Sequence, residues 1–180
     1  MYEKICPTKI SRKFSRVNPG FTLIELLVTI SIIGVLFGIG VAKYNEFNRR
    51  QILNQAAQEL KSNLRLAQDK ALAGEKDCSS SKCGGSDGIC GTNDANEKSL
   101  EGWYVSFSAN NYQIYGKCGV AQFSPQTVDL SGRNITLSSF PSNLVRFKPL
   151  AQGVDGATTI SLSGYGETRP ITVTGTGEIK

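Results

Sequence analysis

The chain has 180 residues, of which 39% are hydrophobic and 19% charged, and it carries a net charge of +5 with no histidine. The missing histidine removes the commonest general base and the commonest metal ligand from its chemistry. The first 20 residues hold five basic side chains against one acid, whereas residues 21–180 hold 15 against 14. This near-neutral main part lacks the basic surface that nucleic-acid binding requires, which argues against DNA as a partner.

An apolar segment follows the basic stretch and runs from Phe21 to Ala42. Glu25 is the only charged residue among its 22 residues. At about 1.5 Å per residue, a helix of this length spans roughly 30 Å, the thickness of the hydrocarbon core of a bilayer. A carboxylate in such a helix is costly and by default marks a functional contact. The sequence therefore predicts one membrane-spanning helix, with the basic leader on the cytoplasmic side.

The junction Gly20-Phe21-Thr22-Leu23-Ile24-Glu25 resembles the cleavage site of type IV prepilins and type II secretion pseudopilins. In that family a basic leader ends in glycine, and the hydrophobic helix begins with Phe-Thr-Leu-Ile-Glu. The resemblance implies that a membrane-embedded prepilin peptidase removes residues 1–20 by cutting after Gly20, and that the new terminus, Phe21, is N-methylated. It also implies that Glu25 pairs with the N-terminal ammonium of a neighbouring subunit as a filament grows.

The same resemblance implies a location and a set of partners. The protein is expected in the bacterial inner membrane as a single-pass protein with its head outside the cytoplasm, and afterwards in a pilus or pseudopilus. The expected partners are the prepilin peptidase, other pilin or pseudopilin subunits, the inner-membrane assembly platform and membrane lipid.

An ordinary secretory signal peptide or signal anchor is the alternative interpretation of this segment. Gly40-Val41-Ala42 has the small-x-small form of a signal-peptidase site. However, the hydrophobic region of a signal peptide is usually about 7–15 residues long. The present segment is longer and has an acid near its start, and the sequence shows no helix break after Ala42.

The helical pattern continues beyond the membrane segment, so that one helix is expected from about Phe21 to Ala73. Apolar residues recur there at spacings of three and four, and Gly74 stands where a C-terminal cap is expected. This amphipathic half, residues 43–73, is expected to pack against a globular head. Its apolar positions are Tyr44, Phe47, Leu53, Ala56, Ala57, Leu60, Leu64, Ala67 and Ala71.

Two glycines of the membrane segment, Gly34 and Gly38, are spaced as Gly-x-x-x-Gly. Small residues at this spacing let helices approach closely, and glycine also weakens a helix locally. The pair could therefore be a packing or melting point during assembly, or the routine glycine content of a membrane helix. Many pilins have a proline near the end of this segment, and because Ala42 stands there, proline-driven melting is in doubt.

Residues 74–101 are polar and glycine-rich, and they are expected to form one long loop. The mature chain contains four cysteines, which in an exported protein predict two disulfides with three possible pairings. A zinc site is disfavoured by the cysteine spacings and by the lack of histidine. Calcium is the one cofactor considered, because the loop contains several side chains with oxygen ligands. No EF-hand spacing is present, however. The cysteines are Cys78, Cys83, Cys90 and Cys118, with Cys6 in the leader; the oxygen ligands are Asp77, Asp87, Asn93, Asp94 and Glu97.

Residues 102–180 read as a β-rich head. A hairpin is predicted from Trp103–Ser108 through Ala109-Asn110-Asn111 into Tyr112–Lys117, and its alternating aromatic residues are expected to pack in a core rather than to stack on bases or sugars. Further strands are expected at Asn134–Ser138, Leu144–Lys148, Thr158–Ser163, Ile171–Thr174 and the last few residues.

The head also resembles that of H-type minor pseudopilins. The resemblance rests on three short patterns and a closing Gly-x-Ile, which begins at Gly177. The patterns are Gly102-Trp103-Tyr104-Val105, Val145-Arg146-Phe147-Lys148-Pro149 and Pro170-Ile171-Thr172-Val173.

The predicted fold is α+β and pilin-like, with a long N-terminal helix packed against an antiparallel sheet. No nucleophile elbow, phosphate loop or metal-binding helix is present, so an enzyme is not expected. The predicted function is that of a minor pilin or pseudopilin subunit. The alternative is a binding module at the filament tip, for DNA, a secreted protein or a surface ligand.

Overall fold

The computed structural model describes residues 20–180, apart from 80, 92–93 and 151–152, and it gives no side-chain description for Gly40 and Ala42. The predictions made for residues 1–19, including Cys6, lie outside the described residues, as does Asn93 of the loop. Contacts divide the chain into two compact units that meet between Lys43 and Tyr44. Each unit is described by itself.

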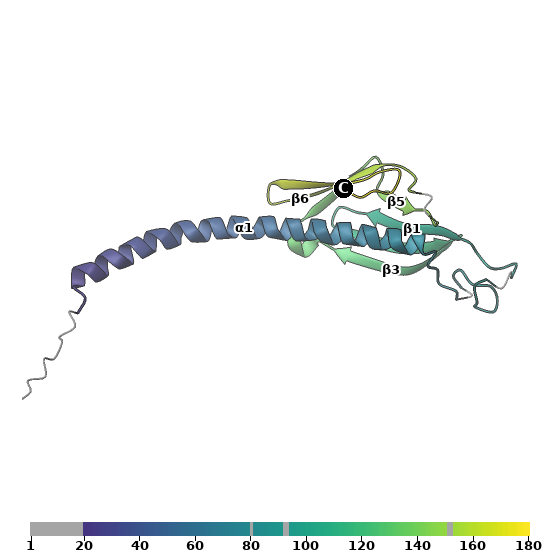
Figure 1. The fold of residues 1–180 in the computed structure, drawn as a ribbon, viewed down its shortest axis with the longest axis horizontal. Coiled ribbons are helices and arrows are strands. Elements are labelled where there is room, and N and C mark those ends of the chain that lie inside the picture. Colours follow the sequence, from purple (N-terminus) through teal and green to yellow (C-terminus); the bar gives the residue numbers. More distant parts are fainter. Residues whose placement is uncertain (1–19, 80, 92–93, 151–152) are drawn as a thin grey trace, which may run out of the picture. The chain divides into compact units, whose positions relative to one another are not determined.

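The order of elements is one long helix followed by strands (Figure 1). A 3₁₀ turn, Ser131–Arg133, separates the third and fourth strands. The elements are α1 (Leu23–Leu72), β1 (Leu100–Phe107), β2 (Asn111–Cys118), β3 (Ala121–Asp129), β4 (Thr136–Phe140), β5 (Leu144–Phe147), β6 (Thr158–Gly164) and β7 (Glu167–Val173).

The first unit contains the N-terminal part of α1. Its large apolar side chains are exposed all round the helix, from Leu23 at 83% to Val41 at 45%. A helix that is apolar on every side suits lipid or the core of an assembly rather than water. By length and composition, α1 is the one helix in the described chain that is able to cross a membrane.

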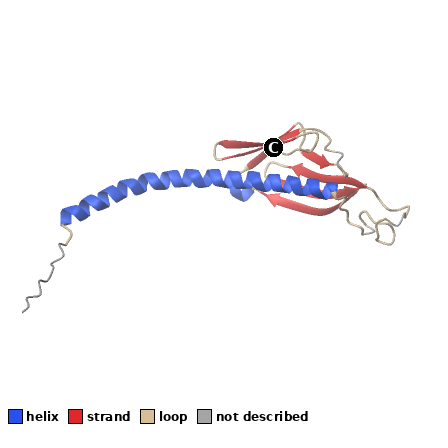
Figure 2. Ribbon diagram, viewed as in Figure 1, coloured by secondary structure: helices blue, strands red, loops and turns tan. Residues whose placement is uncertain are grey.

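The second unit, Tyr44–Lys180, contains the rest of α1 and two antiparallel sheets (Figure 2). The larger sheet has the strand order β3-β2-β1-β5, and the smaller has the order β4-β6-β7. In the larger sheet, alternate residues of β1 such as Trp103 and Val105 belong to the core cluster, whereas Tyr104 between them is buried outside that cluster. This period of two is what a strand with one face on a core dictates.

A stripe of small and aliphatic residues on α1 forms the other side of this core. Leu53, Leu60 and Leu64 are at most 1% exposed, and the alanines between them let the strands approach closely. The smaller sheet closes the same cluster with Leu137, Ile160, Leu162, Ile171 and Val173. Both sheets therefore pack on one face of the helix.

The C-terminal end of α1 is a Schellman cap. The Glu75 N–H donates to the Lys70 carbonyl at 3.0 Å, and the Gly74 N–H donates to the Ala71 carbonyl at 3.1 Å. Gly74 has a φ of +65°, a left-handed conformation that glycine adopts without steric cost. The expected cap is therefore confirmed.

The α+β, pilin-like fold class is confirmed, with four differences in detail. The helix begins at Leu23 rather than near Phe21, because Thr22 caps it, and β1 begins at Leu100, two residues before the expected head. Strand β3 was not predicted, and β7 begins at Glu167, ahead of Pro170. Both strands contain a proline and both lie at sheet edges, where a missing N–H costs no ladder hydrogen bond.

Candidate functional site

The junction between the leader and α1 is the first candidate site. Gly20 and Phe21 are exposed and lie in non-helical backbone immediately before the helix. Thr22 ends this segment as the N-cap, since its Oγ1 accepts a hydrogen bond from the Glu25 N–H at 3.3 Å and its carbonyl accepts one from the Leu26 N–H at 3.2 Å. The Gly20–Phe21 peptide bond is thus outside the helix and accessible to an enzyme.

The spacing Thr22-x-x-Glu25 is that of a capping box, a signal that the sequence reading missed. In this arrangement the carboxylate at the third helical position lies beside the positive end of the helix dipole. Within the described residues, no cation forms an ion pair with the Glu25 carboxylate. The side chain is therefore free to meet a positive group from another molecule, and its role in assembly stays a prediction.

The hydroxyl groups of the apolar segment are satisfied within the helix. The Thr29 Oγ1 donates to the Leu26 carbonyl at 2.9 Å, and the Ser31 Oγ donates to the Leu27 carbonyl at 2.8 Å. A Cβ added to Gly34 or Gly38 would meet no atom within 4 Å, so both glycines border open space. This leaves room for a neighbouring helix, and the packing role of the pair also stays a prediction.

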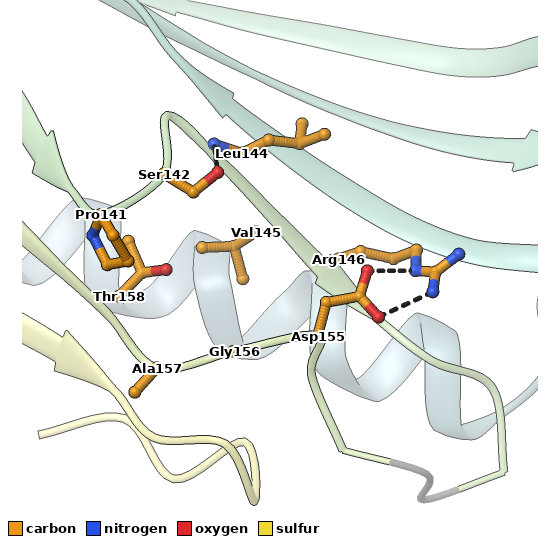
Figure 3. Close-up of a pocket in the computed structure, with 9 residues that line it drawn as sticks. All are labelled: Pro141, Ser142, Leu144, Val145, Arg146, Asp155, Gly156, Ala157 and Thr158. Atoms are coloured by element: carbon orange, nitrogen blue, oxygen red, sulfur yellow. Dashed lines mark hydrogen bonds and ion pairs between the residues drawn. The ribbon is translucent and has the colours of Figure 1, made fainter.

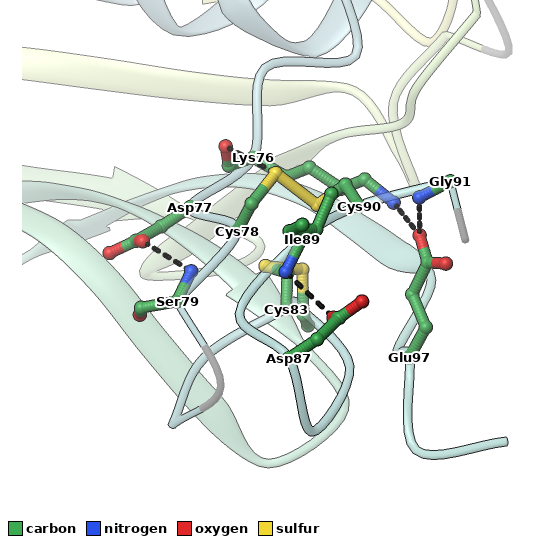
Figure 4. Close-up of a disulfide and its surroundings, with 11 residues drawn as sticks. Lys76, Asp77, Cys78, Ser79, Cys83, Asp87, Ile89, Cys90, Gly91 and Glu97 are labelled. Atoms are coloured by element: carbon green, nitrogen blue, oxygen red, sulfur yellow. Dashed lines mark hydrogen bonds and ion pairs between the residues drawn. A yellow bond between two sulfur atoms is a disulfide. The ribbon is translucent and has the colours of Figure 1, made fainter. Parts of the chain in front are cut away.

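The cysteine loop of the head contains two disulfides (Figure 4). Cys78 is bonded to Cys90 within the loop, and Cys83 is bonded to Cys118 at the end of β2. The two disulfides expected from the even cysteine count are therefore present, and of the three possible pairings this is the one observed. The second disulfide joins the loop to the larger sheet.

Carboxylates hold the rest of this loop by accepting hydrogen bonds from its backbone. Asp94 accepts bonds from the Ser86 N–H and hydroxyl and from the Asn96 N–H, and these bonds lower the pKa of its carboxyl to about 2. The Glu97 Oε1 accepts bonds from Lys76 Nζ at 2.7 Å and from the Gly91 N–H at 2.8 Å. No three acidic or cysteine side chains of the described residues converge as metal ligands. Calcium binding stays a prediction.

The aromatic residues of the β1–β2 hairpin are buried, as expected for core packing. Trp103 packs edge-on against Phe123, and its Nε1 donates to the Glu75 carbonyl at 3.0 Å. On the other face of the sheet, Tyr104 and Tyr115 stack with ring centroids 5.5 Å apart. Because these rings already have partners, the hairpin does not present a stacking surface for bases.

Burial also perturbs the acidity of the hairpin tyrosines. It raises the pKa of Tyr112 to about 12, although the Asn63 Nδ2 donates to its hydroxyl at 2.7 Å. Burial likewise raises the pKa of Tyr115. Both side chains therefore stay neutral at physiological pH and act in packing rather than in proton transfer.

A pocket of about 230 Å³ lies beside β5 in the head (Figure 3). Its charged wall is an ion pair in which Arg146 Nη2 donates to Asp155 Oδ1 at 2.7 Å and Arg146 Nε lies 2.6 Å from Asp155 Oδ2. Lys148 Nζ also reaches Asp155 Oδ1 at 3.1 Å, and these cations hold the pKa of the carboxyl below its usual value. Each of these charged groups therefore already has a partner, although two cations share the one carboxylate.

The junction lies within a segment that matches a known protein family. Residues 16–41 match a family model described as the prokaryotic N-terminal methylation motif. The match covers the end of the leader, the Gly20–Phe21 bond, Glu25 and most of the apolar segment.

Curated relatives match this chain over segments of nearly the same length. Two fimbrial proteins from Pseudomonas aeruginosa are each 35% identical over 66 residues, which is 37% of this chain and 42% of theirs. A type IV major pilin protein, PilA, from Myxococcus xanthus is 41% identical over 68 residues, which is 36% of this chain and 30% of its own. The chain thus matches less than half the length of these relatives. These relatives are named as fimbrial and pilin proteins, in line with the expectation that this chain is not an enzyme. No solved structure matches the chain.

Proposed function

We propose that this chain, whose N-terminal segment places it among the prepilin-type proteins, is a minor pilin or pseudopilin subunit. It is processed after Gly20, N-methylated on Phe21, and assembled into a type IV pilus or a type II secretion pseudopilus. The observation that carries this proposal is the junction itself, where an accessible peptide bond stands five residues ahead of the only charge in an apolar helix.

The chemistry of the junction supports a role in assembly. Hydrolysis of the Gly20–Phe21 bond creates an ammonium group at the end of a helix that already carries Glu25. An ammonium and a carboxylate that meet in an apolar environment attract each other far more strongly than in water. Subunits of this kind can therefore pair head to tail along their N-termini, the ammonium of one with the carboxylate of the next.

The head supports an extracytoplasmic location and the pseudopilin resemblance. Two disulfides form and persist in oxidising compartments outside the cytoplasm. Two of the three patterns shared with H-type minor pseudopilins lie on paired strands, since β1 and β5 align Trp103 with Phe147. A Cβ at Gly102 would overlap the Phe147 carbonyl, so the glycine of one pattern is required by the close approach of the other.

The partners proposed are the prepilin peptidase, other pilin or pseudopilin subunits, the inner-membrane assembly platform and lipid. The proposed location is the bacterial inner membrane, with the head outside the cytoplasm. A filament-tip binding module is the alternative, and its nucleic-acid form gains no support from the near-neutral charge of residues 21–180 or from the buried hairpin aromatics.

Mass spectrometry of the protein purified from its membrane tests the processing. We expect a chain that begins at Phe21 and carries one added methyl group. A chain that begins at Lys43, as an ordinary signal peptidase would leave it, contradicts the proposal, as does a chain that retains residues 1–20.

A substitution of Glu25 tests the assembly role. We expect Glu25→Ala to leave leader cleavage largely intact and to lower incorporation into filaments by about tenfold or more, because an ion pair at contact distance is worth several kcal/mol in a medium less polar than water. Glu46→Ala is the matched control, since Glu46 lies on the same helix beyond the apolar segment and pairs with Arg50 at 2.6 Å. Wild-type incorporation of Glu25→Ala contradicts the proposed role.

A further inference from the structure

The backbone around the Gly20–Phe21 bond depends on where α1 begins. The helix starts at Leu23, and the two residues that flank the bond are exposed and non-helical. If the helix started one turn earlier, the Gly20 carbonyl would accept a hydrogen bond from the Ile24 N–H, as in any α-helix. The carbonyl that water must attack would then be engaged in the helix.

The sequence contains residues suited to such an earlier start. Asn18 is of a type strongly preferred at an N-cap, and Pro19, which follows it, is of a type favoured at the first helical position. Both lie outside the described residues. An earlier start would place Gly20 and Phe21 in the first turn of the helix.

Thr22 supplies the competing start that the structure shows. Its Oγ1 accepts a hydrogen bond from the Glu25 N–H at 3.3 Å, and its carbonyl accepts one from the Leu26 N–H at 3.2 Å. Loss of this cap leaves backbone N–H groups at the start of an apolar helix without a partner. In lipid such groups are costly, so extension of the helix toward Asn18 is favoured over fraying.

We propose that Thr22 is a positioning residue for leader removal: its cap keeps the Gly20–Phe21 bond outside the helix, where a peptidase can bind it in extended form. The inference rests on the proposed function. In the reaction, water adds across the bond; the C–N bond breaks, Gly20 leaves as a carboxylate and Phe21 becomes an ammonium. Thr22 acts on the conformation of the substrate and takes no part in this exchange of atoms.

The test compares four full-length chains in proteoliposomes with purified prepilin peptidase: wild type, Thr22→Ser, Thr22→Val and Asn18→Ala/Thr22→Val. Valine has nearly the shape of threonine but cannot accept the hydrogen bond, whereas serine can. From the usual effect of an N-cap, we expect initial cleavage to be about fivefold slower for Thr22→Val and nearly unchanged for Thr22→Ser. Removal of Asn18 takes away the competing cap and restores cleavage in the double variant.

Amide hydrogen exchange on the uncleaved chains gives a second readout. In the wild type, the N–H groups of Leu23 and Ile24 lie in the first turn, where no intrahelical acceptor is available. We expect exchange at Ile24 to slow in Thr22→Val, because the extended helix supplies an acceptor, and to return to the wild-type rate in the double variant.

The outcomes separate this inference from the proposed function. A wild-type chain that the peptidase does not cut overturns the proposed function. If the wild type is cut and Thr22→Val is cut equally fast, the positioning role is overturned and the proposed function stands. If the double variant stays as slow as Thr22→Val, the peptidase contacts Thr22 directly, and the inference is again overturned.

Discussion

Removal of the two disulfides separately provides a quantitative test of the head. In the chain-entropy model, closing the 12-residue separation of Cys78 and Cys90 stabilises the fold by about 3 kcal/mol, and closing the 35-residue separation of Cys83 and Cys118 by about 4 kcal/mol. Cys83 and Cys118 are also 0% exposed, so alanine at both positions leaves a small cavity that costs roughly 1 kcal/mol more.

We therefore expect the Cys83→Ala/Cys118→Ala variant to lose about 5 kcal/mol and the Cys78→Ala/Cys90→Ala variant about 3 kcal/mol. The assay is urea unfolding of the oxidised full chain in detergent, followed by the fluorescence of Trp103, which is buried and is the only tryptophan. The reasoning that the Cys83–Cys118 bond anchors the loop to the core is refuted by either of two results. One is a larger loss of stability in the Cys78→Ala/Cys90→Ala variant, and the other is a loss of less than about 1 kcal/mol in the Cys83→Ala/Cys118→Ala variant.

Two further predictions concern the head. We expect Gly116→Ala to destabilise the head by about 1–3 kcal/mol, because a Cβ there would overlap the Phe123 ring that packs on Trp103. Gly132→Ala is the control, since a Cβ there meets nothing within 4 Å. Equal unfolding midpoints of the two variants would contradict the proposed packing of Phe123 on Gly116. The pKa of Asp94 falls in the folded loop from 3.8 to about 2, so the stability that its ionised form contributes is present above pH 4 and lost as the pH falls toward 2. The protection of the Ser86 N–H, measured as its exchange rate relative to the intrinsic rate at the same pH, should fall over that range in the wild type. A similar fall in Asp94→Asn would show that another group is responsible.

The long helix was predictable from the sequence, and so was its division into an apolar segment and a segment with one buried stripe. Both follow from the pattern of hydrophobic residues. The apolar run predicts the exposed segment, and the spacing of Leu53, Leu60 and Leu64 predicts the buried stripe that the structure shows. Tyr44 and Phe47, also expected in that stripe, are instead exposed. The cap at the C-terminal end of the helix was also predictable, since Gly74 is of the residue type that a left-handed C′ position favours.

The parts that sequence did not reveal depend on contacts between distant residues. Strand β3 carries Pro125 and few buried residues, so its own pattern is weak, and only pairing with β2 makes it a strand. The disulfide pairing could not be chosen either, because four cysteines on a polar loop and a strand give no local signal of which sulfur atoms meet.

At the junction, the resemblance was visible in the sequence, whereas the geometry was not. The pattern Thr-x-x-Glu was visible, yet its meaning as an N-cap appears only when the helix is seen to start at Leu23. The cap places the cleavable bond outside the helix, and it also fixes Glu25 in the first turn, beside the end of the helix where a new ammonium would form.

The polar groups of the apolar segment differ in what they require. The hydroxyls of Thr29 and Ser31 donate to carbonyls of the preceding turn, and that of Thr22 accepts from the Glu25 N–H, so each is satisfied without another molecule. The Glu25 carboxylate has no such partner in the described chain, and in lipid an ionised group without one is costly. Because a cation from outside the helix offsets that cost, the segment is expected to be more stable in an assembly that supplies an ammonium than alone in the bilayer.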